Sequence, residues 1–461
     1  MKILLAASEV APLIKLGGLG DVMGSLPKAL EKIDVNADVI IPFYPTIDRS
    51  KYPLMKAMEL EVPFDGKNHT VPIFRTKLPD SNVDVLLPEY AHYFNVGGES
   101  AFLNNVSETE MFSFFSRVVV EYVKASFNTY DVIHCHDWHT GMITHLLQEE
   151  LHNERPKTLF TIHNIFYQGK GLPKLIKELG ISPGSHPLID WDIQDGDINL
   201  LLQGITSSDY IGTVSKSYAN EILTTEFGGD FADIVSSRKD RLTGILNGID
   251  YSFFPLDFNV RNWKEAKLSK KNELQKRFDL EVTDRPLFAF ISRLDPGQKG
   301  LDILYEAIPA IVEKGGQFVL LGTGDPKWEE KFRQLTTKGS ISCNIVFDVD
   351  LALDIYVASD FLLIPSKYEP CGLTQMIAMR YGSLPVARAV GGLKDTVKPG
   401  HNGFLFEKYD SKDLINAITL GINLFGSDQH EMMVQHAMNE DFSWRVSAQK
   451  YKILYRKMID E

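Results

Sequence analysis

Short apolar runs alternate with longer stretches of mixed polarity along most of the chain. Runs of four or five apolar residues bounded by polar and turn residues predict buried strands. Alternation of such strands with helices is typical of parallel sheets that helices cover on both faces. The predicted strands are Ile3–Ala7, Ala37–Ile41, Val83–Leu87, Val132–His134, Thr158–Ile162, Tyr210–Val214, Leu242–Leu246, Leu287–Ile291, Phe318–Leu321, Asn344–Phe347, Phe361–Ile364 and Leu384–Ala387.

Longer segments between the strands carry apolar residues at helical spacing, and we predict helices at Leu301–Lys314, Lys327–Lys338 and Gly372–Tyr381. The tail Phe442–Met458 has the same spacing. We therefore expect a C-terminal helix that packs on the body of the protein through Trp444, Ala448, Tyr451, Leu454 and Tyr455.

The regular pattern breaks at Tyr251–Asp284, which is rich in Asn, Lys and Asp. We place a domain boundary there and predict an α/β protein with two doubly wound, Rossmann-like domains that face a deep cleft. The expected ranges are 1–252 for the first domain, 253–441 for the second, and 442–461 for a helix that returns to the first. Ligands of such sheets bind beyond the carboxyl ends of the strands, so motifs that directly follow strands are candidates for the site.

Composition narrows the functional classes. The chain has 461 residues, enough for two sizeable cores, and a formal net charge of −13. This acidic balance argues against general binding of nucleic acids or anionic membranes, which needs a basic face. Three widely spaced cysteines and the absence of a membrane-length apolar run predict a reduced, cytoplasmic setting.

Three motifs in the first half follow predicted strands. KLGGLGD (15–21) offers glycines and a cation, which suit either a structural turn or a diphosphate site. HCHDWH (134–139) contains possible metal ligands, but residues that straddle a strand end point in different directions, so we favour a polar cluster that contacts a sugar. Trp138 would offer that sugar an apolar face. TIHN (161–164) ends another strand and adds His163 to the same edge.

Two motifs in the second half, SRLDPGQKG (292–300) and SKYEPCGLTQ (366–375), also follow strands. Arg293 and Lys299 suit the neutralisation of a diphosphate leaving group, the electrostatic task of a transferase that uses a nucleotide sugar. Glu369 just precedes a Pro-Cys-Gly turn after another strand, and these charges at strand ends of one sheet together favour an anionic ligand. We reject the D-x-D triplet at 348–350 as a metal site, because such triplets arise by chance in an acidic chain.

Taken together and in this order, these motifs and the segments FTIHNIFYQG, GILNGID and GGLKDTV resemble bacterial glycogen synthases and plant starch synthases. The similarity extends over essentially the whole chain. It implies a GT-B fold and the transfer of glucose, with retained configuration, from ADP-glucose to the non-reducing 4-hydroxyl of an α-1,4-glucan. It also implies that the enzyme needs no metal and no cofactor other than its co-substrate.

The resemblance assigns roles to residues of this chain. It implies catalytic roles for Glu369, His163, Arg293 and Lys299. It implies donor binding by Lys15, Gly17, Gly18, Asn247, Phe347, Gly372, Leu373 and Thr374, with Phe347 over the adenine. It implies acceptor binding by Asp21, Asp137, Trp138, His139 and Asn164.

Some positions depart from the family pattern. Leu16 replaces a small residue, and the segment between Arg293 and Lys299 is one residue longer than usual, which puts the reach of Lys299 in question. Two alternatives stand beside the synthase. One is a GT-B transferase that uses UDP-glucose or a small acceptor, because few residues read the nucleotide base. The other is a glucan-binding homologue that has lost catalysis, which the longer segment before Lys299 would support.

Overall fold

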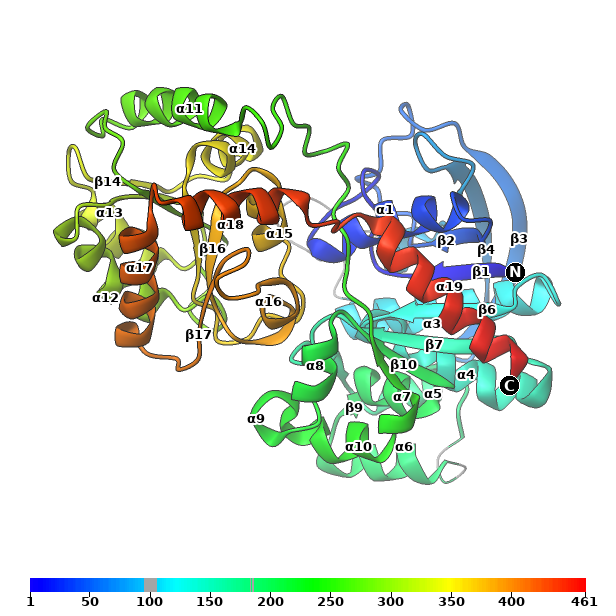
Figure 1. Cartoon of the computed structure of the whole chain (residues 1–461). Helices are drawn as coiled ribbons and strands as arrows, with labels where there is room; N and C mark the ends of the chain where they lie inside the picture. Colours follow the sequence, from blue (N-terminus) through cyan, green and yellow to red (C-terminus); the bar gives the residue numbers. More distant parts are fainter. Residues whose placement is uncertain (95–105, 183, 185) are drawn as a thin grey trace. The chain divides into compact units, whose positions relative to one another are not determined.

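A computed structural model describes residues 1–94, 106–182, 184 and 186–461. The chain forms two compact units (Figure 1). The first comprises residues 1–214, 219–248 and 444–461, and the second comprises residues 215–218 and 249–443. The boundary expected after residue 252 therefore falls inside the second unit. The C-terminal helix α19 (Trp444–Asp460) belongs to the first.

The sheet of the first unit has the strand order β11-β10-β7-β6-β1-β2-β5-β4-β3. Its strands from β11 to β5 are parallel, and buried apolar side chains fill most of their positions. The strands are β1 (Lys2–Ala6), β2 (Asn36–Ile40), β3 (Met55–Phe64), β4 (Lys67–Lys77), β5 (Asp84–Pro88), β6 (Val132–His136), β7 (Lys157–Ile162), β10 (Tyr210–Thr213) and β11 (Leu242–Gly244). A separate pair is formed by β8 (Lys170–Gly171) and β9 (Ile198–Asn199).

The helices of this unit connect the strands and cover the sheet. They are α1 (Gly18–Glu31), α2 (Ala91–Phe94), α3 (Glu108–Ala125), α4 (Gly141–Leu151), α5 (Lys174–Glu178), α6 (Pro187–Asp192), α7 (Leu200–Ser207), α9 (Thr225–Gly228), α10 (Ala232–Ser237) and α19. Helix α8 (Lys216–Glu221) begins within residues 215–218. As expected, Trp444, Ala448, Tyr451, Leu454 and Tyr455 of α19 are buried.

An antiparallel edge departs from the predicted pattern. Strands β3 and β4 form a hairpin that pairs with β5 and makes the sheet mixed. The turn is Asp65–Gly66, with both residues at positive φ, and this dipeptide between alternating apolar and polar residues is a strong hairpin signal. Sequence reasoning overlooked it because the search favoured continuous apolar runs.

The sheet of the second unit is parallel throughout, in the order β14-β13-β12-β15-β16-β17. Its strands are β12 (Leu287–Ile291), β13 (Gln317–Leu321), β14 (Ile341–Asn344), β15 (Phe361–Ile364), β16 (Leu384–Arg388) and β17 (Phe404–Phe406). Its helices are α11 (Trp263–Arg277), α12 (Leu301–Glu313), α13 (Pro326–Leu335), α14 (Val349–Ala358), α15 (Thr374–Arg380), α16 (Gly391–Thr396), α17 (Ser411–Leu424) and α18 (Asp428–Asn439).

Two predictions in this half were wrong. The strand expected at Asn344–Phe347 lies three residues earlier, because Ile341 pairs with Phe318 while Val346 and Phe347 extend into solvent. The irregular stretch Tyr251–Asp284 contains helix α11, whose polar sequence hid its pattern. Its buried side chains include two lysines, Lys267 and Lys271, with their ammonium groups held by carbonyls and by Asp360.

Each sheet has a point where the strand order reverses. In the first sheet this point lies between β1 and β6, and in the second it lies between β12 and β15. Loops that leave neighbouring strands in opposite directions open a crevice there, where ligands of doubly wound sheets bind. The segments that follow these four strands carry most of the predicted site residues. Among the helices in the described ranges, none combines the length and apolar character needed to cross a bilayer.

Candidate active site

The loop after β1 is built around a buried carboxylate that sequence reasoning missed. Glu9 is 5% exposed, and its Oε2 accepts hydrogen bonds from the backbone amides of Leu16 and, at 3.0 Å, Gly17. A side chain at Gly20 would approach the same carboxylate at 3.1 Å. Glu9 therefore fixes the backbone of the glycine-rich loop from its buried side. Its signal in the sequence is a single acidic residue inside the apolar run of 3–14.

The predicted residues of this loop face outward. Lys15, Leu16, Gly17 and Gly18 are exposed, and a side chain added at Gly18 would meet nothing within 4 Å. Lys15 Nζ lies 2.8 Å from Asp21 Oδ1 in an ion pair between two half-exposed side chains. Such a pair contributes little to stability because water screens it, so the ammonium is readily available to an anionic ligand.

The end of β6 carries a row of buried histidines. His134 is fully buried, with Nδ1 at 2.8 Å from Tyr455 Oη and Nε2 at 2.7 Å from Thr161 Oγ1. His136 Nδ1 lies 2.9 Å from His163 Nε2, so the row continues to the end of β7. Burial lowers the pKa of both His134 and His136, and it lowers that of His163 to about 4. These imidazoles are therefore neutral near pH 7, and each can donate one hydrogen bond and accept another.

Asp137 connects the two strand ends. Its Oδ1 accepts a 2.7 Å hydrogen bond from the backbone amide of His163, and its own amide donates to Thr161 O at 2.9 Å. The residue is 8% exposed and has φ +58 with ψ 178, a backbone conformation that residues other than glycine rarely adopt. Burial raises the pKa of Asp137 to about 7. Asp137 thus positions His163 as well as lying beside it.

Trp138 does not present the open apolar face that we expected. Its indole is 7% exposed and packs edge-on against Phe112 and stacks on His139, with ring centroids 5.3 Å and 4.1 Å apart. A side chain at Gly169 would lie 2.1 Å from the indole, which shows how closely that backbone approaches. The indole therefore supports the strand end. Burial lowers the pKa of His139 to about 3, and its buried Nδ1 has no hydrogen-bond partner.

Two exposed aromatic residues lie just beyond this row and were not predicted. Phe166 and Tyr167 are 44% and 51% exposed and follow Asn164, whose Oδ1 accepts from the Phe166 amide at 3.1 Å. Exposed aromatic rings next to polar groups are a frequent sign of a binding surface. Their signal was present in FTIHNIFYQG, where two aromatics follow a strand. Asn247, predicted as a donor contact, follows β11 and is 5% exposed, with its buried Oδ1 unpartnered.

The second unit carries charged side chains at the carboxyl ends of its strands, where the first unit carries histidines. Lys299 Nζ lies 2.8 Å from Glu369 Oε2, and Ser366 Oγ donates to the same oxygen at 2.8 Å. Both charged side chains are largely buried, with 17% and 10% of their surfaces exposed. The pair joins the segment after β12 to the segment after β15 at the reversal point of the sheet. Since both donors use Oε2, Oε1 of Glu369 is the oxygen available to a ligand.

The longer Arg293–Lys299 segment does not displace Lys299. Asp295 closes a turn in which its Oδ1 accepts from the Gly297 amide at 2.9 Å and its carbonyl accepts from the Lys299 amide at 2.9 Å. With this turn in place, Lys299 reaches Glu369. Arg293 is 66% exposed, and its nearest carboxylate partner, Asp295, is 4.0 Å away. Its guanidinium is therefore only weakly engaged.

Backbone packing fixes the loop that carries Glu369. The Gly392 amide donates to Glu369 O at 3.0 Å, and a side chain at Gly391, which has φ +46, would lie 2.0 Å from that carbonyl. On the other side, Gln375 Nε2 donates to the carbonyls of Cys371 and Gly372. Gly372, Leu373 and Thr374 are half-buried, and α15 begins at Thr374 rather than at Gly372.

Phe347 follows β14 and is 84% exposed, so its ring is open to a ligand but lies away from the β12–β15 point. The neighbouring Asp348 caps α14, with Oδ1 accepting from the Leu351 amide at 2.9 Å. A capping role accounts for the D-x-D triplet without a metal.

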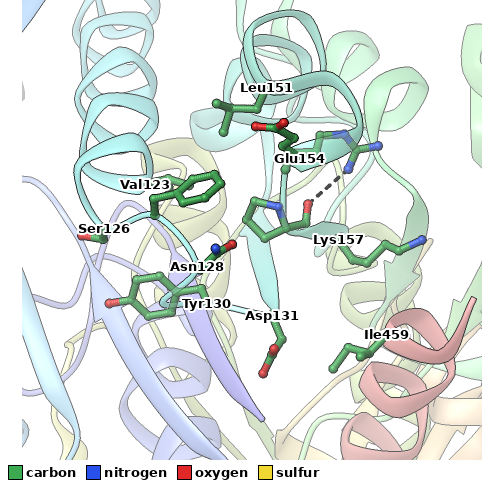
Figure 2. Close-up of a pocket in the computed structure, with 12 residues that line it drawn as sticks. Val123, Ser126, Asn128, Tyr130, Asp131, Leu151, Glu154, Lys157 and Ile459 are labelled. Carbon is green, nitrogen blue, oxygen red and sulfur yellow. Dashed lines mark hydrogen bonds between the residues drawn. The ribbon is translucent and has the colours of Figure 1, made fainter.

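A cavity of about 210 Å³ opens at the amino ends of β6 and β7 in the first sheet. Figure 2 shows Tyr130 and Asp131, which precede β6, and Lys157, which begins β7, around it, with Ile459 of α19 on one side. None of the predicted site residues lines this cavity. It lies at the amino ends of the strands, so the sheet separates it from the histidine row.

Comparison with known proteins decides the family. A family model described as the starch synthase catalytic domain matches residues 2–237, and one for group 1 glycosyl transferases matches residues 285–422. The chain is 38% identical to a glycogen synthase of Thermosipho melanesiensis, with all of both chains covered. It is 39% identical to one from Geotalea daltonii, with 100% of this chain and 99% of the relative covered. The chain belongs to the glycogen and starch synthase family.

Solved structures agree with this assignment. The catalytic domain of starch synthase IV from Arabidopsis thaliana, bound to ADP and acarbose, matches with a TM-score of 0.86 and 30% identity over 100% of this chain and 99% of that one. A sucrose-phosphate synthase from Thermosynechococcus elongatus matches with a TM-score of 0.60 and 18% identity, which shows a shared fold alone. The protein is therefore a glycosyltransferase with the GT-B fold, as the sequence predicts.

Proposed function

We propose that the protein extends an α-1,4-glucan by transferring glucose from ADP-glucose to its non-reducing 4-hydroxyl, with retained configuration. The observation that carries this proposal is the buried Lys299–Glu369 pair at the reversal point of the second sheet. It places a cation and a carboxylate side by side, as a transferase with a diphosphate leaving group and a sugar donor requires. The relatives named glycogen synthase, and the starch synthase bound to ADP and acarbose, support the choice of ADP-glucose and a glucan.

The leaving diphosphate develops negative charge as the glycosidic bond breaks, and fixed cations lower that barrier. Lys299 is held in place by its pair, while Arg293 is exposed and weakly engaged, so the two would neutralise the diphosphate together. We propose that Gly372, Leu373 and Thr374 add donors to the phosphates. Phe347 would cover the adenine, and Lys15 with Gly17 and Gly18 would contribute from the first unit.

The sugar needs hydrogen-bond partners without strong charge. Glu369 has Oε1 available for glucose hydroxyls, and the neutral ring of His163 can donate to or accept from a hydroxyl. On the acceptor side we propose Asp21, Asp137, His139 and Asn164, with Phe166 and Tyr167 as surfaces on which glucan rings stack. Trp138 acts there through packing.

The first test is incubation of purified protein with glycogen and either ADP-glucose or UDP-glucose, followed by measurement of nucleotide release and glucan length. We expect ADP release with longer chains, and a much lower rate with UDP-glucose. Comparable rates with both donors would overturn the donor assignment, and no turnover by folded protein would overturn the function.

We also propose that transfer needs no metal and no cofactor beyond the co-substrate, because cationic side chains take the role that Mg²⁺ has in other phosphate chemistry. Rates measured with metal-free protein should not rise when Mg²⁺ or Mn²⁺ is added. A several-fold rise would contradict this part of the proposal and leave the rest standing.

A further inference from the structure

Helix α4 carries a cluster of potential metal ligands away from the predicted site residues. His145 and Glu149 lie four residues apart on α4, so they project from the same face of the helix. His186, the residue before α6, approaches them from another segment. One ligand atom from each residue lies within 4.8 Å of the other two.

His145 supplies the observation that points to a missing ligand. It is 6% exposed, and its Nδ1 lies 3.3 Å from Ser207 Oγ, which accounts for one ring nitrogen. Its Nε2 is buried and has no hydrogen-bond partner. A buried polar atom without a partner is uncommon and costs stability, so it calls for an explanation.

The other two residues are arranged to complete the site. His186 Nδ1 lies 3.2 Å from Glu149 Oε1, and the rings of His145 and His186 meet edge to face with centroids 5.0 Å apart. Tetrahedral zinc with ligands at about 2.0–2.2 Å places the donor atoms roughly 3.4 Å from one another. The 3.2 Å contact already has this spacing. His186 and Glu149 are 20% and 36% exposed, which leaves an entry path and room for water as a fourth ligand.

We propose that His145 Nε2, Glu149 and His186 bind one Zn²⁺ ion at a structural site on the first unit. A ligand set of two imidazoles and a carboxylate favours zinc, whereas calcium and magnesium prefer oxygen ligands alone. Ser207 Oγ accepts from His145 Nδ1–H in this arrangement, which fixes the tautomer that presents Nε2 to the metal.

The ion fastens the start of α6 to α4. Helix α6 ends at Asp192, whose carboxylate accepts from the Asn199 amide at 3.0 Å and from Gln203 Nε2 at 2.8 Å. Through these bonds α6 is tied to the start of α7. The metal therefore strengthens the connection between α4 and the segment that leads to α7, and it has no part in glucosyl transfer.

The test measures zinc binding and does not depend on the activity. Apo protein is titrated with Zn²⁺, metal is counted by mass spectrometry after gel filtration, and Co²⁺ serves as a probe because its visible spectrum reports tetrahedral ligation. The variants are His186→Ala and Glu149→Gln, since both residues are partly exposed and their loss should leave the core intact. The control is His152→Asn, which removes an exposed histidine just after α4 that is outside the cluster.

We expect one Zn²⁺ per chain for wild type and for His152→Asn, and at least tenfold weaker binding for the two cluster variants, with unchanged far-UV circular dichroism. Zinc should raise the melting temperature of wild type and leave that of His186→Ala unchanged. No stoichiometric binding by wild type, or equal binding by His186→Ala and Glu149→Gln, would overturn the proposal. Binding without a rise in melting temperature would overturn the fastening role.

Discussion

The two sheets expose different chemistry at equivalent places. His134 and His136 lie in the second half of β6 and His163 directly follows β7, and burial keeps all three neutral. Beyond β12 and β15 of the second unit lie Lys299 and Glu369, a charged pair at 2.8 Å. Both sheets have parallel strands around a reversal point, and the side chains at the strand ends make the difference.

Under the proposed function, this difference would let the two units bind chemically different groups. A neutral imidazole such as that of His163 suits sugar hydroxyls, which need directional hydrogen bonds and no strong field. A held cation suits a diphosphate, which needs charge neutralisation. We therefore expect substitutions at the strand ends of the second unit to affect turnover most. Substitutions at the strand ends of the first unit should be more evident in the free energy of unfolding and its pH dependence.

The largest effect should come from Glu369→Gln. It keeps the shape of the side chain and removes the charge that pairs with Lys299, so we expect turnover to fall by about 10³-fold while ADP affinity changes by less than about tenfold. Glucan-elongation kinetics and ADP titration calorimetry measure the two quantities. Glu313→Gln, an exposed residue at the end of α12, is the matched control. Turnover like that of wild type would remove Glu369 from the mechanism.

Gly391→Ala tests whether the loop that carries Glu369 depends on its close packing against the backbone of Gly391. The new Cβ would lie 2.0 Å from Glu369 O at a φ of +46, so we expect a loss of about 3 kcal/mol in the free energy of unfolding, from overpacking and strain together. Gly400→Ala has φ +72 with open space around it and should lose only about 1 kcal/mol. Urea unfolding compares the two, and equal losses would show that contact with the Glu369 loop is unimportant.

The histidine row predicts a pH dependence. His163 has a folded pKa of about 4 and an ordinary value of 6.5, so between these pH values the unfolded chain binds more protons. The free energy of unfolding therefore falls as pH falls from 6.5 to 4, by about 1.4 kcal/mol per pH unit for each such histidine.

Asp137 acts in the opposite direction, because its pKa is raised to about 7 and its protonation favours the folded state as pH falls. One carboxyl opposes several histidines, so the net trend is loss of stability in acid. His163→Gln should reduce the slope by about 1.4 kcal/mol per pH unit, measured by urea unfolding at pH 6.5, 5.5 and 4.5. An unchanged slope would mean that this ring is not held neutral.

The smallest effect is expected for Leu16→Thr, which changes a side chain that is 76% exposed. Only the backbone amide of Leu16 contacts Glu9, so the free energy of unfolding should change by less than about 0.5 kcal/mol. Chemical denaturation measures this. A loss above about 1 kcal/mol would show that the loop needs the leucine side chain.

Apolar runs predicted most parallel strands because burial on both faces leaves a continuous signal, as at Leu287–Ile291 and Phe361–Ile364. The hairpin β3–β4 alternates polar and apolar residues, so continuous apolar runs do not reveal it. Helix α11 buries lysines, a residue type that normally indicates a solvent-facing position. Helix α11 is defined by tertiary partners such as Asp360, which no local pattern reveals.

The candidate site was predictable in its location, because motifs after strands meet at the reversal points, and less so in its details. Trp138 is an aromatic next to polar residues, and only the approach of Gly169 shows that it is buried. Glu9 is separated from Gly17 by an irregular loop, so its hydrogen bond depends on a backbone path that spacing does not specify.

Helix α19 belongs to the first unit but is synthesised after the second, so the first unit cannot complete its packing until then. His134 Nδ1 lies 2.8 Å from Tyr455 Oη, and Leu246 O accepts from Ser447 Oγ, so the first unit contains bonds to residues that are synthesised after residues 249–443. At about 5–20 residues per second, residues 249–443 take roughly 10–40 s to emerge before the helix does. During that interval the first unit is a nascent chain with an uncovered apolar face. Residues 249–443 thus lie between two parts of the first unit in the chain, and the burial of His134 is complete only once α19 has been made.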